Sequence, residues 1–156
     1  MPDVKGLLVL GAAAALVLPA GAAAARAVVP LRAQRSIASE TTRLAYVPAR
    51  VSAPYRYHGW ILASGRLRIW FGHRLEHHKL IAFDARFFQG VCRARADHSY
   101  QMAGVKVWFG VIDGRRSAWR CVHGRKLIAW TRLGPRTFAD VGLARIAASG
   151  HRIRLS

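Results

Sequence analysis

The sequence predicts a mainly β fold: an antiparallel sandwich or small barrel of about six to eight strands with one C-terminal helix. Apolar and basic residues alternate in short runs such as residues 66–71 and 105–112, the pattern of strands with one buried face. Turn-forming residues separate these runs, and a helix-start pattern occurs near the end of the chain. With 156 residues, 53% of them hydrophobic, the chain can form one domain with a core.

Residues 1–27 are expected to form a signal peptide. Residues 7–18 supply the apolar run, Pro19 and Gly21 interrupt it, and small residues up to Ala27 supply an Ala-x-Ala cleavage site. The protein is therefore expected to be secreted or held in the cell envelope. The alternative is an uncleaved membrane anchor, although alanine, proline and glycine dilute the run below what a membrane span favours.

The charges around this segment argue against a well-formed signal. Lys5 precedes the apolar run and Asp3 offsets it, whereas Arg26 and further arginines follow the run. This distribution is the opposite of the positive-inside expectation. Cleaved export and a retained anchor therefore both stay open as interpretations.

Residues 28–54 are predicted to be a linker or irregular lead-in. Pro30, Pro48 and Pro54 punctuate this segment, and its apolar residues follow no sustained period. Residues 55–156 are then expected to form a single β-rich domain.

The strands of that domain are expected where aromatic and β-branched residues alternate with polar ones. The expected strands are residues 55–62, 66–71, 86–95, 105–112, 117–122 and 126–132. Turns are expected at residues 63–65 and 123–125 and at Asp113-Gly114, which is a strong hairpin signal between alternating runs.

The last part of the chain changes character after Gly134. Thr137 is a candidate N-cap and Asp140 an acidic residue in the first turn, so a helix is predicted over residues 138–148. Gly150 ends it, and residues 151–155 are a candidate edge strand.

The sequence contains two cysteines, Cys92 and Cys121. An even number of cysteines in an exported chain indicates a disulfide, and a bridge between these two would enclose a loop of about 30 residues. A catalytic or metal-binding pair of thiols would favour the closer Cys-x-x-Cys spacing. We therefore predict a structural disulfide.

The formal net charge of +18 makes anionic partners the natural class. These include an anionic polymer, a membrane surface, or nucleic acid bound without sequence specificity. The other interpretation is compositional, because arginine outnumbers lysine 21 to 4, as a GC-rich genome produces without selection for binding.

Basic and aromatic side chains share one face of two predicted strands. Arg66, Arg68 and Trp70 alternate on one of them, and Lys106 and Trp108 on the other. If the two strands are neighbours, these five residues form a surface that stacks on rings and pairs with phosphates. The alternative is a second buried face, with Trp70 and Trp108 beneath a covering helix.

The segment His73-Arg74-Leu75-Glu76-His77 fits the His-x-x-Glu-His pattern. It resembles the inverted zinc motif of the pitrilysin-type metallopeptidases. The resemblance covers five residues and implies that His73 and His77 bind zinc while Glu76 activates water.

The rest of the chain departs from that family. A further zinc-binding glutamate is expected downstream of the motif, but the other glutamate is Glu40, upstream. The motif also needs a helix, whereas strand-like runs flank it here. An internal similarity between residues 68–83 and 106–130 likewise indicates that residues 73–77 form a turn.

The sequence therefore favours a non-catalytic binding domain without a cofactor or metal ligand. A zinc hydrolase using His73, Glu76 and His77 is one alternative. A structural or partner-binding envelope protein with compositional charge is another.

Overall fold

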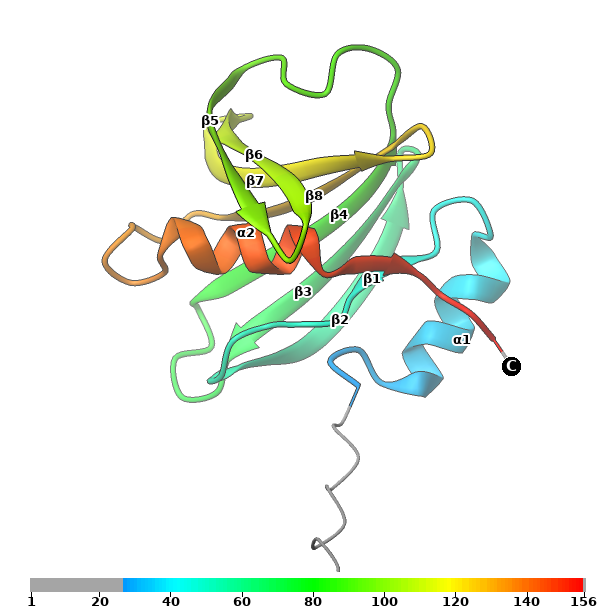
Figure 1. The fold of residues 1–156 in the computed structure, drawn as a ribbon. Helices are drawn as coiled ribbons and strands as arrows, with labels where there is room; N and C mark the ends of the chain where they lie inside the picture. Colours follow the sequence, from blue (N-terminus) through cyan, green and yellow to red (C-terminus); the bar gives the residue numbers. More distant parts are fainter. Residues whose placement is uncertain (1–26, 156) are drawn as a thin grey trace, which may run out of the picture.

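Nine β-strands and two α-helices follow one another over residues 27–155, the part of the chain that the computed structural model describes (Figure 1). Apart from Ala27, the predicted signal peptide lies outside these residues. The elements are α1 (Leu31–Glu40), β1 (Tyr46–Pro48), β2 (Tyr55–Ala63), β3 (Arg66–His73), β4 (Leu80–Phe87), β5 (Ala96–Met102), β6 (Val105–Ile112), β7 (Arg115–Val122), β8 (Arg125–Thr131), α2 (Asp140–Ala148) and β9 (Gly150–Arg152).

Seven of the strands form one antiparallel sheet in the order β2-β3-β4-β8-β7-β6-β5. The strands β1 and β9 form a separate antiparallel pair. The predicted mainly β, antiparallel fold with one C-terminal helix is confirmed. The large sheet is not a closed barrel, because β2 and β5 lie at its two ends and do not pair with each other.

Hairpins with two-residue turns join four pairs of neighbouring strands. Both central residues of each turn have positive φ, as type I′ turns require, and glycine stands second in every case. These turns are Ser64-Gly65, Ala103-Gly104, Asp113-Gly114 and His123-Gly124. The turn at Ala103-Gly104 was not among the sequence predictions, whereas the other three are confirmed.

One face of the large sheet, called the inner face here, forms the core. It contributes alternating apolar residues such as Leu67, Ile69 and Phe71, which are fully buried. Helix α2 lies across this face over β5 to β8 and adds Leu143 and Ile146 to the same core (Figure 1). Burial of this face is the main favourable contribution to folding.

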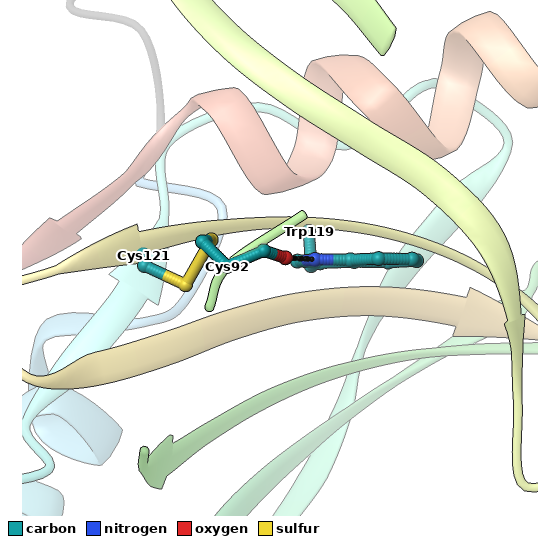
Figure 2. Close-up of a disulfide and its surroundings, with 3 residues drawn as sticks. All are labelled: Cys92, Trp119 and Cys121. Carbon is teal, nitrogen blue, oxygen red and sulfur yellow. Dashed lines mark hydrogen bonds between the residues drawn. A yellow bond between two sulfur atoms is a disulfide. The ribbon is translucent and has the colours of Figure 1, made fainter. Parts of the chain in front are cut away.

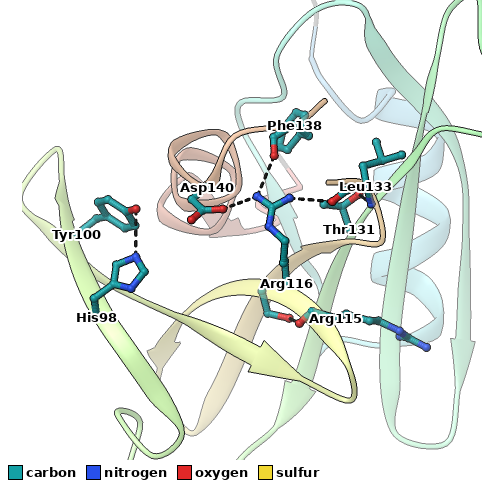
Figure 3. Close-up of polar contacts among 9 residues, drawn as sticks. His98, Tyr100, Arg115, Arg116, Thr131, Leu133, Phe138 and Asp140 are labelled. Carbon is teal, nitrogen blue, oxygen red and sulfur yellow. Dashed lines mark hydrogen bonds and ion pairs between the residues drawn. The ribbon is translucent and has the colours of Figure 1, made fainter. Parts of the chain in front are cut away.

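Arg116 of β7 fixes the start of α2 on the sheet. Its guanidinium donates to the carbonyl oxygens of Leu133, at 2.7 Å, and Phe138, at 2.8 Å. It also forms an ion pair with Asp140 in the first turn of α2 (Figure 3). One partly buried side chain therefore joins the sheet, the loop after β8 and the helix.

The helix differs slightly from its prediction. It begins at Asp140, and its N-cap is Ala139, which makes no side-chain cap hydrogen bond. Thr137 therefore does not cap it. The ion pair of Asp140 with Arg116 takes the place of a side-chain cap in holding this end.

Two other sequence predictions are corrected. Residues 28–54 are not an irregular lead-in throughout, because they contain α1 and β1. Residues 86–95 are not a strand: β4 ends at Phe87, and the next segment turns through hydrogen bonds from Ala94 N to Val91 O and from Ala96 N to Arg93 O. Arginine alternates with small residues in this segment, as in a strand, but residues 88–95 pair with no other strand of the described chain.

Candidate functional site

The face of the large sheet opposite the core, called the outer face here, carries the basic and aromatic residues. Because side chains alternate along β3, Arg66, Arg68 and Trp70 point away from the core residues between them. The register extends the same face to β4, β8, β7 and β6. Its second hydrophobic cluster contains Ala82, Trp119, Ile128 and Trp130.

The five predicted binding residues share this face but do not meet. Strands β3 and β6 are separated by β4, β8 and β7, so they are not the neighbours that the sequence interpretation required. Four strand spacings correspond to about 19 Å. Arg66, Arg68 and Trp70 therefore lie in one half of the outer face, and Lys106 and Trp108 in the other.

A loop covers the half of the outer face around Trp119 of β7 and Lys126 of β8. This disulfide loop, residues 88–95, is held by the Cys92–Cys121 bridge, whose Cα atoms lie 6.0 Å apart, so the predicted disulfide is confirmed. The indole N–H of Trp119 donates to the Cys92 carbonyl at 2.6 Å, and Trp119 is fully buried (Figure 2). This covered half is therefore a small second core.

Gly110 of β6 allows the chain to pass closely over the covered half. A Cβ at this position would lie 2.6 Å from the carbonyl oxygen of Arg95 and 3.2 Å from the Trp119 ring. No side chain fits at that distance, so glycine is needed where the loop leads into β5.

Lys126 of β8 lies beneath the same loop and is only 7% exposed. Its ammonium group lies 4.7 Å from the ring centroids of both Phe88 and Trp119. Burial, together with the nearby charges of Arg86 and Arg95, lowers the pKa of Lys126 to about 8. The aromatic rings offset part of the lost hydration.

The other half of the outer face is open and contains a pocket of about 340 Å³. We call it the Arg–Trp pocket. Its lining residues are Arg68, Trp70, His78, Leu80, Arg115, Trp130, Arg132 and Leu133. No acidic side chain is among the described residues that line it.

Arg68 is held in place by Asp84 at the edge of this pocket. The guanidinium donates from Nε to Oδ1 at 2.8 Å and from a terminal nitrogen to Oδ2 at 2.9 Å, a bidentate pair. Asp84 is 3% exposed, and Arg66 approaches it at 4.0 Å. Arg68 is therefore largely neutralised and serves mainly to build the pocket.

Arg115 and Arg132 supply charge that no carboxylate in the described chain pairs with. The Arg115 guanidinium stacks 4.0 Å from the ring centroid of Trp130. Burial and the charges of Arg68 and Arg132 lower the pKa of Arg115, although arginine stays protonated at neutral pH. An anion in the pocket would offset the repulsion between the Arg115 guanidinium and the charges of Arg68 and Arg132.

The aromatic wall of the pocket consists of two tryptophans. The rings of Trp70 and Trp130 meet edge to face, with centroids 5.3 Å apart, and Arg68 lies over both. The buried indole N–H of Trp130 has no hydrogen-bond partner in the described part of the chain. Trp130 is only 5% exposed, so the accessible ring of the pocket is that of the partly exposed Trp70, which stands beside the positive charge.

His73 is the last residue of β3 and residues 74–77 lie in the β3–β4 connection, so the segment is not helical and the predicted turn is confirmed. The His73 Nδ1 atom accepts hydrogen bonds from the backbone N–H groups of Leu75 and Glu76. Glu76 pairs with Lys79 at 2.6 Å, which lowers the pKa of the Glu76 carboxyl. Residues 27–155 contain no cluster of three or more potential metal-ligating side chains.

Sequence reasoning missed Arg115, Trp130 and Arg132 as pocket residues. A signal for part of the set was present, because Trp130 and Arg132 are two residues apart in a predicted strand and so share a face. Their approach to Arg68 and Trp70 depends on β8 pairing with β4, which no local pattern encodes.

Comparisons of the chain with protein-family models, with curated proteins and with solved structures found no match. Neither helix in residues 27–155 combines the length and apolar character needed to cross a membrane.

Proposed function

We propose that the protein is a non-catalytic binding module for an anionic polymer, which it binds at the open half of its outer face. The observation that carries this proposal is the Arg–Trp pocket, where Arg115 and Arg132 stand beside Trp70 and Trp130 with no acidic side chain in the described lining. Buried or stacked arginine without a carboxylate partner favours phosphate or carboxylate ligands.

The two tryptophans narrow the class of polymer. Ring faces next to guanidinium groups favour a repeating unit that combines a ring with an anionic group, such as a nucleotide or a phosphorylated sugar. An anionic lipid surface offers charge without a ring inside the pocket. Polymers with rings are therefore the preferred ligands in this proposal.

The proposed location is the cell exterior or envelope. The Cys92–Cys121 disulfide supports it, because such bonds persist in oxidising compartments. The apolar run of residues 7–18 supports it independently.

Binding to a single-stranded DNA oligonucleotide, used as a ring-bearing polyanion, tests the proposal. The Arg115→Ala variant should weaken affinity about tenfold, since one charge-assisted contact is worth about 1.5–3 kcal/mol. Arg136→Ala removes an equal charge from an exposed position outside the pocket and is the matched control. Trp70→Leu keeps the apolar packing, removes the ring face and should weaken binding of the oligonucleotide more than binding of inorganic polyphosphate.

Three results would contradict the proposal. One is affinity that does not fall with rising salt, since polyanion binding releases counterions. Another is an equal loss of affinity in Arg115→Ala and Arg136→Ala, which would indicate general charge and the compositional interpretation. The third is binding to anionic vesicles with no binding to oligonucleotides.

A further inference from the structure

A second basic cavity lies far from the Arg–Trp pocket. It is a groove of about 710 Å³ formed by the end of β7, the start of β8, and β9 with the residues after it. Its lining residues are Tyr46, Arg120, Val122, His123, Arg125, Gly150, His151, Arg152, Ile153, Arg154 and Leu155. We call it the basic groove.

Backbone carbonyls, rather than carboxylates, position two arginines in this groove. The guanidinium of Arg120 donates to the carbonyl of Gly150, while its buried Nε has no partner in the described chain. Arg125 donates to the carbonyl of Arg43 at 2.9 Å and to that of His123 at 2.5 Å. Both side chains are therefore held in place with their charge uncompensated.

Arg152 and Arg154 add charge on the C-terminal side of the groove. Both are exposed, and neither side chain forms an ion pair or hydrogen bond within residues 27–155. No acidic side chain occurs among the described lining residues. Burial also lowers the pKa of Arg120, so this guanidinium has lost hydration that a bound anion would replace.

We propose that the basic groove is a second anion site, which binds the backbone of a linear phosphate polyanion by charge alone. Guanidinium forks match phosphate oxygens in geometry as well as charge. The rings in the described lining are those of Tyr46, which is 5% exposed, and of the exposed histidines His123 and His151, and the lining contains no tryptophan. The groove therefore offers more guanidinium groups and smaller rings than the Arg–Trp pocket.

The two sites cannot share one short stretch of ligand. Arg115 belongs to the outer face and Arg120 to the inner face, because their positions in β7 differ by five, an odd number, and side chains alternate between the faces along a strand. They are also five residues apart along β7, which corresponds to about 17 Å. The protein therefore has two anion sites on opposite faces and can bridge two polymer chains. The groove site stands by itself, whereas bridging rests on the proposed function.

Affinity for inorganic polyphosphate, measured over a series of salt concentrations, tests the groove. The Arg152→Ser/Arg154→Ser variant should lose about tenfold in affinity at moderate salt, and the slope of log affinity against log salt should shrink by about 1.5. The control is Arg32→Ser/Arg35→Ser, which removes two exposed charges from α1 and should change affinity less than about twofold.

Equal losses in the two double variants would overturn the groove site, and so would no loss in either. Arg115→Ala tests the two sites separately. It should weaken binding of the oligonucleotide and leave the affinity for polyphosphate within about twofold. If polyphosphate affinity falls with Arg115→Ala but not with the groove variant, the groove proposal fails while the Arg–Trp pocket stands.

Bridging is tested by mixing the protein with a labelled oligonucleotide and a differently labelled polyphosphate. Co-migration of both labels with the protein is expected, and either the groove double variant or Arg115→Ala should reduce it. Competition between the two polymers for one site would contradict bridging.

Discussion

The covered and open halves of the outer face are built from the same kinds of residues, but a loop covers one half and a pocket lies in the other. In the covered half, Trp119 and Lys126 are buried beneath the disulfide loop. In the open half, Trp130 is also buried beneath the Arg115 guanidinium, but the two residues border a pocket of about 340 Å³. The difference shows that a basic-aromatic pattern becomes core or candidate site according to whether a loop covers it.

The two halves also differ in how far their charged side chains are separated from water and from partners of opposite charge. Lys126 has lost most of its hydration, and its pKa falls to about 8. Arg68 in the open half keeps a bidentate carboxylate partner, and Arg115 and Arg132 remain available to a ligand. The covered half therefore contributes to the structure at an electrostatic cost, while the open half keeps its charge for binding.

Removing the cover should produce the largest effect. The Cys92→Ser/Cys121→Ser variant opens a loop of about 30 residues, so the free energy of unfolding should fall by about 3–4 kcal/mol. Chemical denaturation measures this loss, and a change in Trp119 fluorescence should accompany it. Reductant should destabilise the natural chain but not the double variant. Free thiols in the native protein would refute the bridge.

In the open half, Asp84→Asn should lower the free energy of unfolding by about 2–3 kcal/mol, because Arg68 loses its charged partner in a partly buried site. The same change should raise affinity for the oligonucleotide, since the pocket becomes more positive. Asp97→Asn, at an exposed position, is the matched control and should change neither quantity. Tighter binding of the oligonucleotide by both variants would mean that the overall charge of the protein, and not the pocket, sets the affinity.

Lys126 gives the covered half a pH signature. Between the folded pKa of about 8 and the unfolded value of 10.5, the unfolded chain holds a proton that the folded chain has released, so stability rises with pH. Between pH 7 and 9.5 the natural chain should gain about 2 kcal/mol relative to Lys126→Met. Denaturation at several pH values measures the difference, and parallel stability curves for the two proteins would contradict it.

The smallest effect is expected at Lys106. Its ammonium lies 4.9 Å from the Trp108 ring centroid, on the far side of the disulfide loop from the Arg–Trp pocket. Lys106→Ala should therefore change oligonucleotide affinity by less than about twofold, against about tenfold for Arg115→Ala. A larger effect at Lys106 would extend the binding surface across the whole outer face.

The sequence by itself determined the local features of this protein. Alternation along residues 66–71 and 105–112 identified strands and their two faces, and glycine-containing turns identified three of the four two-residue hairpins. Two cysteines were enough to predict the Cys92–Cys121 bridge. Strands and turns depend on residues that are close in sequence, and two cysteines allow only one pairing. A single sequence therefore encodes each of these features directly.

The tertiary structure alone decided what those features form together. The pairing of β4 with β8 brings Trp130 and Arg132 to Trp70, and the pairing of β1 with β9 joins segments about a hundred residues apart. The bridge at Cys92 lays residues 88–95 over Trp119 instead of extending them as a strand. These outcomes follow from long-range packing, where the burial of a whole face outweighs local pattern, and that balance separates the covered half from the open half.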